Sequence, residues 1–318
     1  MPQQTILVVG HGSRVPEAVA EFHEFTHALE SFLGRPVDSC FLELADPDLA
    51  TGLTRAAEKA QTGGQVVILP LFLGGAGHQK NDVAYAIQWA RNQFADVAFK
   101  YGVPLGPHAK LVDLLDRRVA DCLAAAPQAL PPHDTAVLLV SRGSSDPNSN
   151  SEVARLARLL FEKRSFKTVE YAYQAVAQPN VIEGMRRCRQ LGAKQVIVLQ
   201  YLLFTGRVDR NIRELSEQAG QDLGLKVLQA GYLGVHPLLM EIAAQRLQET
   251  ADGAAAMTCD LCKYRFSMAG YEHQVGQPQD SHHLHGGAHH HHHHDGHDHD
   301  HHHEHEHDHE HHHDHEHH

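Results

Sequence analysis

The chain has 318 residues, of which 42% are apolar and 21% charged, as in a globular protein long enough for two ordinary domains. Its net charge of −12 is uneven, because all 27 Lys and Arg precede Phe266 whereas 11 of the 39 acidic residues follow from there. A near-neutral body with an acidic end argues against nucleic-acid binding, which depends on clustered Lys and Arg.

The first half of the chain alternates short β-branched segments with longer amphipathic ones. It begins with a strand pattern at residues 6–9, without the basic region and cleavage site of a signal peptide. A helical pattern follows at residues 16–32, further strand patterns at residues 37–44, 65–72 and 97–103, and another helix at residues 107–125. Strands that alternate with helices predict βαβ units, and therefore a parallel sheet with helices on both faces.

A Pro-bearing linker, AAAPQALPPHD at residues 124–134, separates this half from a second one. VLLVSRGSSDP then repeats ILVVGHGSRVP, QAVAQPNV repeats LELADPDL, QVIVLQYLL repeats QVVILPLFL, and LGVHPLL repeats LGPHAKL. The four matches keep their order at an offset of about 130 residues, which indicates an internal duplication. We therefore predict an α/β fold of two duplicated halves, residues 1–125 and 134–250, that face each other across a cleft.

The chain from residue 251 onward differs in composition. Residues 251–281 contain MTCDLCKYR, and residues 282–318 hold 23 of the 31 histidines, interspersed with Asp and Glu. Such a tract cannot bury enough apolar surface to offset chain entropy, so we predict a disordered tail. Its imidazoles and carboxylates would bind Ni²⁺, Co²⁺ or Zn²⁺ by local concentration, as a store or delivery arm. The run HHHHHH also fits a purification tag.

The five cysteines are odd in number and three are scattered, which does not suit a disulfide framework and indicates a reducing, cytoplasmic setting. Cys259 and Cys262 form a C-x-x-C pair, but a [4Fe–4S] cluster usually needs four thiolates. Either a homodimer supplies two from each chain, or Cys40, Cys122 or Cys188 joins the pair. Zinc, a redox dithiol and a passive pair are the alternatives. No stretch approaches the roughly 18 to 20 apolar residues of a membrane span.

Three strand ends of the first half carry groups that suit metal chemistry. His11 follows the first strand, Glu43 ends the second, and His78 follows the third in PLFLGGAGHQKND. Open α/β folds place their sites at the carboxyl edge of the sheet, where these residues would meet. Two imidazoles and a carboxylate suit divalent metals such as Co²⁺, Ni²⁺, Fe²⁺ or Zn²⁺. A neutral imidazole can also accept a proton.

Either histidine alone is also typical of a satisfied polar residue near a loop. A functional pair is favoured because both lie in glycine-rich turns after strands, where backbone can approach a ligand. The second half also lacks them: Arg142 replaces His11, and Val208 or its neighbour Arg207 replaces His78. The second half would then hold a carboxylate-rich substrate through basic residues in strand-end loops. Those candidates, for each of which solvated surface charge is the alternative, are Arg14, Lys80, Arg142, Arg207 and Arg210.

VVGHGSR, LFLGGAGHQKND and ADPDL, in duplicated α/β halves, resemble the sirohydrochlorin chelatases of the type-II chelatase superfamily. CDLCKYR with a histidine-rich end resembles the long-form cobaltochelatases of cobalamin biosynthesis, so the resemblance covers the whole chain. It implies ATP-independent insertion of Co²⁺ into sirohydrochlorin, with Fe²⁺ and Ni²⁺ as the alternatives on this scaffold. It also implies that His11 and His78 bind metal and accept protons, that Glu43 assists, and that the Cys pair holds an iron–sulfur centre.

A metal-storage protein or metallochaperone is the non-enzymatic alternative, in which the histidine tract would be the functional part. The pair His11 and His78 favours the enzyme, since a store has no need of two histidines at strand ends. The partners predicted for the enzyme are sirohydrochlorin and a divalent metal ion, with neither nucleic acid nor membrane.

Overall fold

The computed structural model describes residues 4–77, 79–254 and 272–278. His78, Cys259, Cys262 and the predicted tail at residues 282–318 therefore lie outside the described residues. Among the described residues, no helix has both the length and the apolar character needed to cross a membrane.

In the described part of the first half, strands and helices alternate along the chain. They are β1 (Gln4–Gly10), α1 (Pro16–Leu33), β2 (Asp38–Phe41), α2 (Leu49–Ala60), β3 (Gln65–Pro70), the π-helical turn η1 (Gln79–Val83), α3 (Ala84–Gln93), β4 (Ala98–Tyr101) and α4 (Ala109–Ala124). Strand β1 pairs with β2 and β3, and β3 pairs with β4, all in parallel, giving the order β2-β1-β3-β4.

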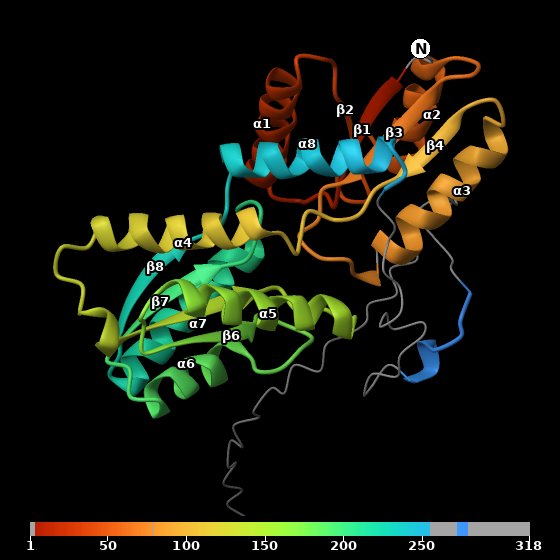
Figure 1. Cartoon of the computed structure of the whole chain (residues 1–318). Coiled ribbons are helices and arrows are strands. Elements are labelled where there is room, and N and C mark those ends of the chain that lie inside the picture. The colour runs from red at the N-terminus through yellow and green to blue at the C-terminus, as the bar shows by residue number, and fades with distance from the viewer. Residues whose placement is uncertain (1–3, 78, 255–271, 279–318) are drawn as a thin grey trace, which may run out of the picture. The chain divides into compact units, whose positions relative to one another are not determined.

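The second half repeats this arrangement. After η2 (Pro132–Asp134) come β5 (Thr135–Ser141), α5 (Pro147–Lys163), β6 (Thr168–Tyr173), α6 (Val181–Gln190), β7 (Gln195–Gln200), α7 (Arg207–Leu223), β8 (Lys226–Gly231) and α8 (Pro237–Ala251), with η3 (Glu272–Gln274) beyond them. The strand order β6-β5-β7-β8 is the same as in the first sheet, and again all pairs are parallel. The predicted fold of two duplicated α/β halves is confirmed (Figure 1).

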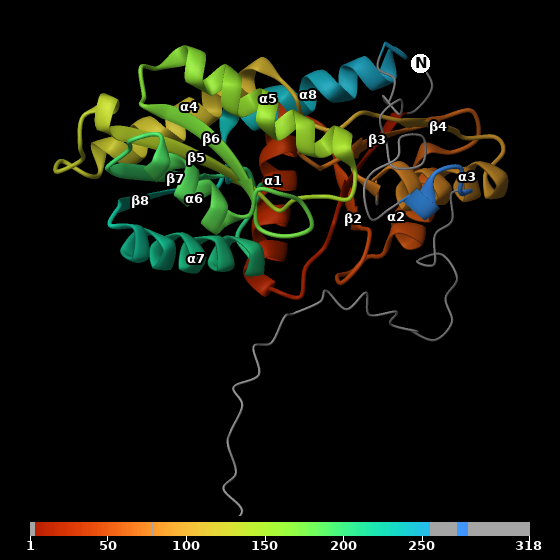
Figure 2. The same ribbon diagram turned by 90° about the horizontal axis from the view of Figure 1, so that it is seen from below.

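The last helix of each half packs against the sheet of the other half. Helix α4 packs against β7, β8 and α5, whereas α8 packs against α1, β3 and β4. Figure 1 shows α4 along the second sheet and α8 beside α1. In Figure 2, α4 and α5 lie on one face of the second sheet, and α6 and α7 on the other. One apolar cluster consequently includes side chains of both sheets, among them Val8 and Leu139, so the two halves share a core.

The duplication extends to individual backbone contacts. The N–H of Leu71 donates to the carbonyl of Val9, and the N–H of Tyr201 donates to the carbonyl of Val140, in both cases where the third strand of a half ends. His108 and His236, from the repeated LGPH and LGVH motifs, cap α4 and α8: each Nδ1 accepts a backbone N–H, at 3.0 and 3.1 Å. Burial, aided by nearby Arg side chains, lowers the pKa of His236, which suits this acceptor role. These two histidines are therefore structural.

The strand predicted at residues 37–44 ends earlier than expected, because β2 stops at Phe41. Beyond it the chain turns, and Leu44 takes a φ of 63°, which no strand accommodates. Val176 occupies the same place in the second half with a φ of 67°. Both halves thus leave the second strand through the same turn, which places Glu43 in a loop at the sheet edge.

Candidate active site

The ends of β1 and β2 bring His11 and Glu43 together. His11 Nδ1 lies 3.5 Å from Glu43 Oε1, and the two side chains are 38% and 26% exposed, so both can meet a ligand. The Glu43 N–H also donates to the His11 carbonyl at 3.0 Å. Between them Gly12 has a φ of 92°, and a Cβ there would lie 1.7 Å from the Glu43 carbonyl oxygen. Only glycine fits this turn, and the close approach holds the imidazole and carboxylate side by side.

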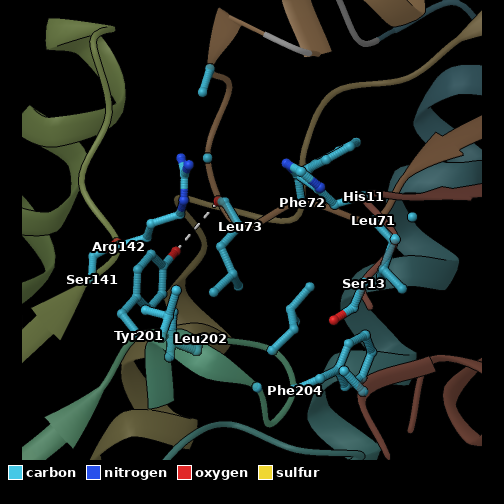
Figure 3. Close-up of a pocket in the computed structure, with 18 of the residues that line it drawn as sticks. His11, Ser13, Leu71, Phe72, Leu73, Ser141, Arg142, Tyr201, Leu202 and Phe204 are labelled. Atoms are coloured by element: carbon cyan, nitrogen blue, oxygen red, sulfur yellow. Dashed lines mark hydrogen bonds between the residues drawn. The ribbon is translucent and has the colours of Figure 1, made fainter. Parts of the chain in front are cut away.

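A cavity of about 400 Å³ lies where the duplication predicted a cleft, lined by strand-end loops of both halves. Most of its wall is apolar, and includes Phe22, Phe41, Leu71, Phe72, Leu73, Leu202, Leu203 and Phe204. Figure 3 shows His11 with Phe72 on one side of Leu73, and Arg142 on the other. The Phe72 ring packs edge-on to the imidazole, with centroids 6.3 Å apart. Such a cavity suits a mostly apolar ligand, with Arg142 available to an anionic group on it.

The five basic candidates occupy different environments. Arg142 and Arg207 line the cavity and are exposed, as their predicted role requires. Arg14 and Arg210 are exposed outside its wall, and Arg210 Nη2 lies 3.9 Å from Glu17 Oε2.

The position of Lys80 in the structure does not support the substrate-binding role predicted for this residue. Its side chain is 2% exposed, and Lys80 Nζ lies 2.7 Å from Asp146 Oδ2, which is fully buried. This ion pair joins η1 of the first half to the N-terminal end of α5 in the second. The ammonium group is committed to a contact between the halves, because leaving a buried carboxylate unpaired would cost several kcal/mol.

The second half lacks the imidazole–carboxylate pair. The N–H of Glu43 donates to the carbonyl of His11, and in the duplicate the N–H of Ala175 donates to the carbonyl of Arg142. Arg142 and Ala175 therefore stand where His11 and Glu43 stand in the first half. Gly143 keeps the tight turn, with a φ of 86° and its would-be Cβ 2.0 Å from the Ala175 carbonyl oxygen. The turn is common to both halves, whereas the imidazole and the carboxylate belong to the first.

A three-ligand metal site stays a prediction. Among the described residues, no group of three or more His, Cys, Asp or Glu side chains is placed to hold a metal ion. His11 and Glu43 supply two of the three predicted ligands, and His78 lies outside the described residues.

Two residues near the cavity were not predicted. Gln79 lines it and is 1% exposed, yet neither amide atom has a hydrogen-bond partner. Glu152 lies next to Ser149 and Gly74 of the wall, and its Oε2 is likewise buried without a partner. The position of Gln79 directly after His78, in the same motif, could have identified it as a residue near the cavity. Nothing in the pattern of α5 marked Glu152.

Burial raises the pKa of Glu152 to about 7; Lys80 opposes the rise, Asp146 adds to it and Arg155 opposes it. As the pH increases above the ordinary value of 4.5, the unfolded chain loses this proton before the folded chain does. Folding stability therefore falls between about pH 4.5 and pH 7, and the whole penalty is present above pH 7.

Replacing Glu152 with Gln should remove this penalty. We expect the variant to be more stable than the wild type by about 1 to 3 kcal/mol near pH 8, with the difference vanishing on acidification to about pH 4.5. Urea unfolding at the two pH values measures both numbers. Equal stability near pH 8 would mean that Glu152 carries no buried charge.

Comparison with known proteins gives a consistent result. Residues 5–122 and 136–250 both match the CbiX family. The chain is 39% identical over 272 residues to a sirohydrochlorin cobaltochelatase of Priestia megaterium, a match that covers 83% of this chain and 86% of that protein. It is 36% identical over 244 residues to a sirohydrochlorin ferrochelatase of the same organism, covering 76% and 89%. SirB from Bacillus subtilis with Fe³⁺ superposes with a TM-score of 0.68 at 29% identity, covering 79% of this chain and 97% of that one.

Proposed function

The chain belongs to the CbiX family, and from this premise we propose that it is a sirohydrochlorin cobaltochelatase, inserting Co²⁺ into sirohydrochlorin without ATP. The observation that carries the proposal is His11, which lines an apolar cavity formed by both halves and is paired with the partly exposed carboxylate of Glu43. The choice of cobalt rests on the relative at 39% identity, and iron, the metal in the name of the relative at 36%, is the alternative.

The geometry suggests a division of labour between the halves. The flat macrocycle would lie against the apolar wall, with its carboxylates toward Arg142 and Arg207, since guanidinium groups bind carboxylates bidentately. That orientation presents the ring nitrogens to the first half. His11 would hold the incoming metal together with Glu43 and the predicted ligand His78.

Insertion also releases two pyrrole protons, which need an acceptor. An imidazole nitrogen that binds metal cannot take a proton at the same time. Glu43, 3.5 Å from His11 Nδ1 and partly exposed, is placed to accept one as the metal passes to the macrocycle, and the His11 imidazole can accept the other once it has released the metal. The side chains that hold the metal and those that accept the pyrrole protons thus belong to the same half.

The proposal does not depend on the remaining predictions from sequence. Cys259 and Cys262, with the iron–sulfur centre predicted for them, lie outside the described residues, as does the histidine tract. The cluster, the delivery arm, a homodimer and a cytoplasmic location therefore stay predictions, as does the absence of nucleic acid and membrane partners.

A metal competition tests the proposal. The full chain is given metal-free sirohydrochlorin and equal amounts of Co²⁺, Fe²⁺ and Ni²⁺ without oxygen, and the products are identified by absorbance and mass. Cobalt-sirohydrochlorin should form first. Faster formation of the iron product would instead make the chain a ferrochelatase, and no acceleration of any metal over the uncatalysed rate would contradict the chelatase itself.

A further inference from the structure

The duplication places one carboxylate at the same position in both halves. Helix α1 begins at Pro16 and α5 begins at Pro147, and the sixth residue of each is a glutamate, Glu21 and Glu152. Both helices follow the first strand of their half, so the two carboxylates have equivalent places relative to the cavity. Their surroundings differ, and the difference points to a function for Glu152.

Glu21 is fully engaged by the opposite half. The N–H of Thr205 donates to Glu21 Oε2 at 2.9 Å, and the Tyr232 hydroxyl donates to Glu21 Oε1 at 2.6 Å. Thr205 belongs to the loop between β7 and α7, which lines the cavity from Tyr201 to Gly206. A glutamate of the first half therefore fixes a cavity loop of the second.

The equivalent hydrogen bond from a loop of the first half to Glu152 is not formed. Thr205 is the fifth residue after β7 ends at Gln200, and Gly75 is the fifth residue after β3 ends at Pro70. Glu152 Oε2 is buried without a hydrogen bond, and lies 3.0 Å from the place that a Cβ on Gly74 would take. Gly75 is buried as well, and among the described residues no hydrogen bond engages its N–H. The buried Glu152 acceptor therefore lies beside Gly74, one residue from the buried Gly75, and the two groups are not paired. Leaving buried donors and acceptors without partners is unfavourable.

We propose that Glu152 is a positioning residue, which accepts the Gly75 N–H when the tetrapyrrole binds and thereby fixes the loop leading to His78. The inference rests on the proposed function. It is supported by the hydrogen bond from the Thr205 N–H to Glu21, which shows that the fold allows a glutamate at this helix position to bind the equivalent loop of the opposite half. It is also supported by the loop itself, since Leu71 to Gly74 line the cavity and a bound macrocycle would press on them.

The loop that carries Gly74 and Gly75 already lies against the second half. Leu73, in the same loop, already contacts the second half, because its carbonyl accepts the Tyr201 hydroxyl at 3.4 Å (Figure 3). Glycine at 74 leaves room for the carboxylate, whereas a side chain there would meet Glu152 Oε2 and Ser149 Oγ at 3.0 Å. Closing the contact would pair the carboxylate with an N–H donor, and hydrogen bonds to ionised acceptors are among the stronger ones in proteins.

Amide hydrogen exchange on the full chain tests the contact directly, with metal-free sirohydrochlorin as the probe. In the wild type, ligand should slow exchange at residues 72–77 by about 10-fold or more, as expected for one charge-assisted hydrogen bond. In Glu152→Gln the ligand should slow it by less than about twofold. Equal protection in both proteins would overturn the proposal.

Kinetics provide the second readout. Glu152→Gln should lower kcat by about 10-fold while the affinity for sirohydrochlorin changes by less than about twofold, since the residue positions the loop and does not touch the ligand. The matched control is Glu162→Gln on the same helix, whose exposed carboxylate pairs with Arg158 and should leave both values unchanged. The proposal fails if Glu152→Gln has wild-type kcat, or if it unfolds more easily than the wild type near pH 8. Wild-type insertion in the same assay separates this failure from failure of the chelatase function.

Discussion

Replacing His11 with Ala is expected to lower the rate of Co²⁺ insertion by about 10²- to 10⁴-fold at saturating metal, the usual loss when an acid–base or metal-binding group is removed. The reason is geometric: His11 lines the cavity and is paired with Glu43, and the second half offers no substitute, because Arg142 and Ala175 occupy the equivalent places. His78→Ala is expected from sequence to have a similar effect. Initial rates followed by absorbance measure the loss.

His236→Ala is the matched control for this result. His236 caps α8 through a hydrogen bond from the Leu238 N–H, so the variant should lose about 0.5 to 2 kcal/mol of stability and keep its insertion rate. If His11→Ala inserted cobalt at nearly the wild-type rate, His11 would be a structural histidine like His236.

Replacing Lys80 with Met should destabilise the protein by about 3 to 5 kcal/mol, because it leaves Asp146 buried and uncompensated. Glu152 would also lose the ammonium group that opposes the rise of its pKa. The loss should therefore be larger near pH 8 than near pH 5. Urea unfolding at both pH values measures it.

Lys110→Met is the control, since Lys110 Nζ lies 2.7 Å from Glu241 Oε2 but both side chains are more than a third exposed. Solvent screening limits such a pair to about 0 to 1 kcal/mol. Equal losses in the two variants would mean that the Lys80–Asp146 pair does not hold the halves together.

Much of the fold could be predicted from sequence because the duplication and the alternation of strands and helices are local signals. The exchange of α4 and α8 between the halves could not, since an amphipathic helix shows the same pattern whichever sheet it covers. The early end of β2 could not be predicted, because the turn sets the positive φ of Leu44 and an isolated Leu does not signal a turn.

The site could also be predicted only where local sequence signals determine it. His11 and Glu43 meet because they follow adjacent parallel strands, which sequence order alone implies. The burial of Lys80 could not be predicted because its partner Asp146 lies 66 residues away, and only the packed structure shows that both are buried. Likewise the repeat aligns Glu21 with Glu152, but which of them has hydrogen-bond donors depends on loops of the opposite half.

The most direct test of the central claim is the rate of Co²⁺ insertion into sirohydrochlorin as a function of the concentration of the full chain. A chelatase predicts a rate that rises in proportion to the protein, with each molecule turning over many times. A metal store predicts the opposite, because it would withdraw free Co²⁺ and slow the uncatalysed reaction. A rate that stays flat or falls as protein is added would contradict the catalytic roles assigned to the cavity, His11 and Glu43.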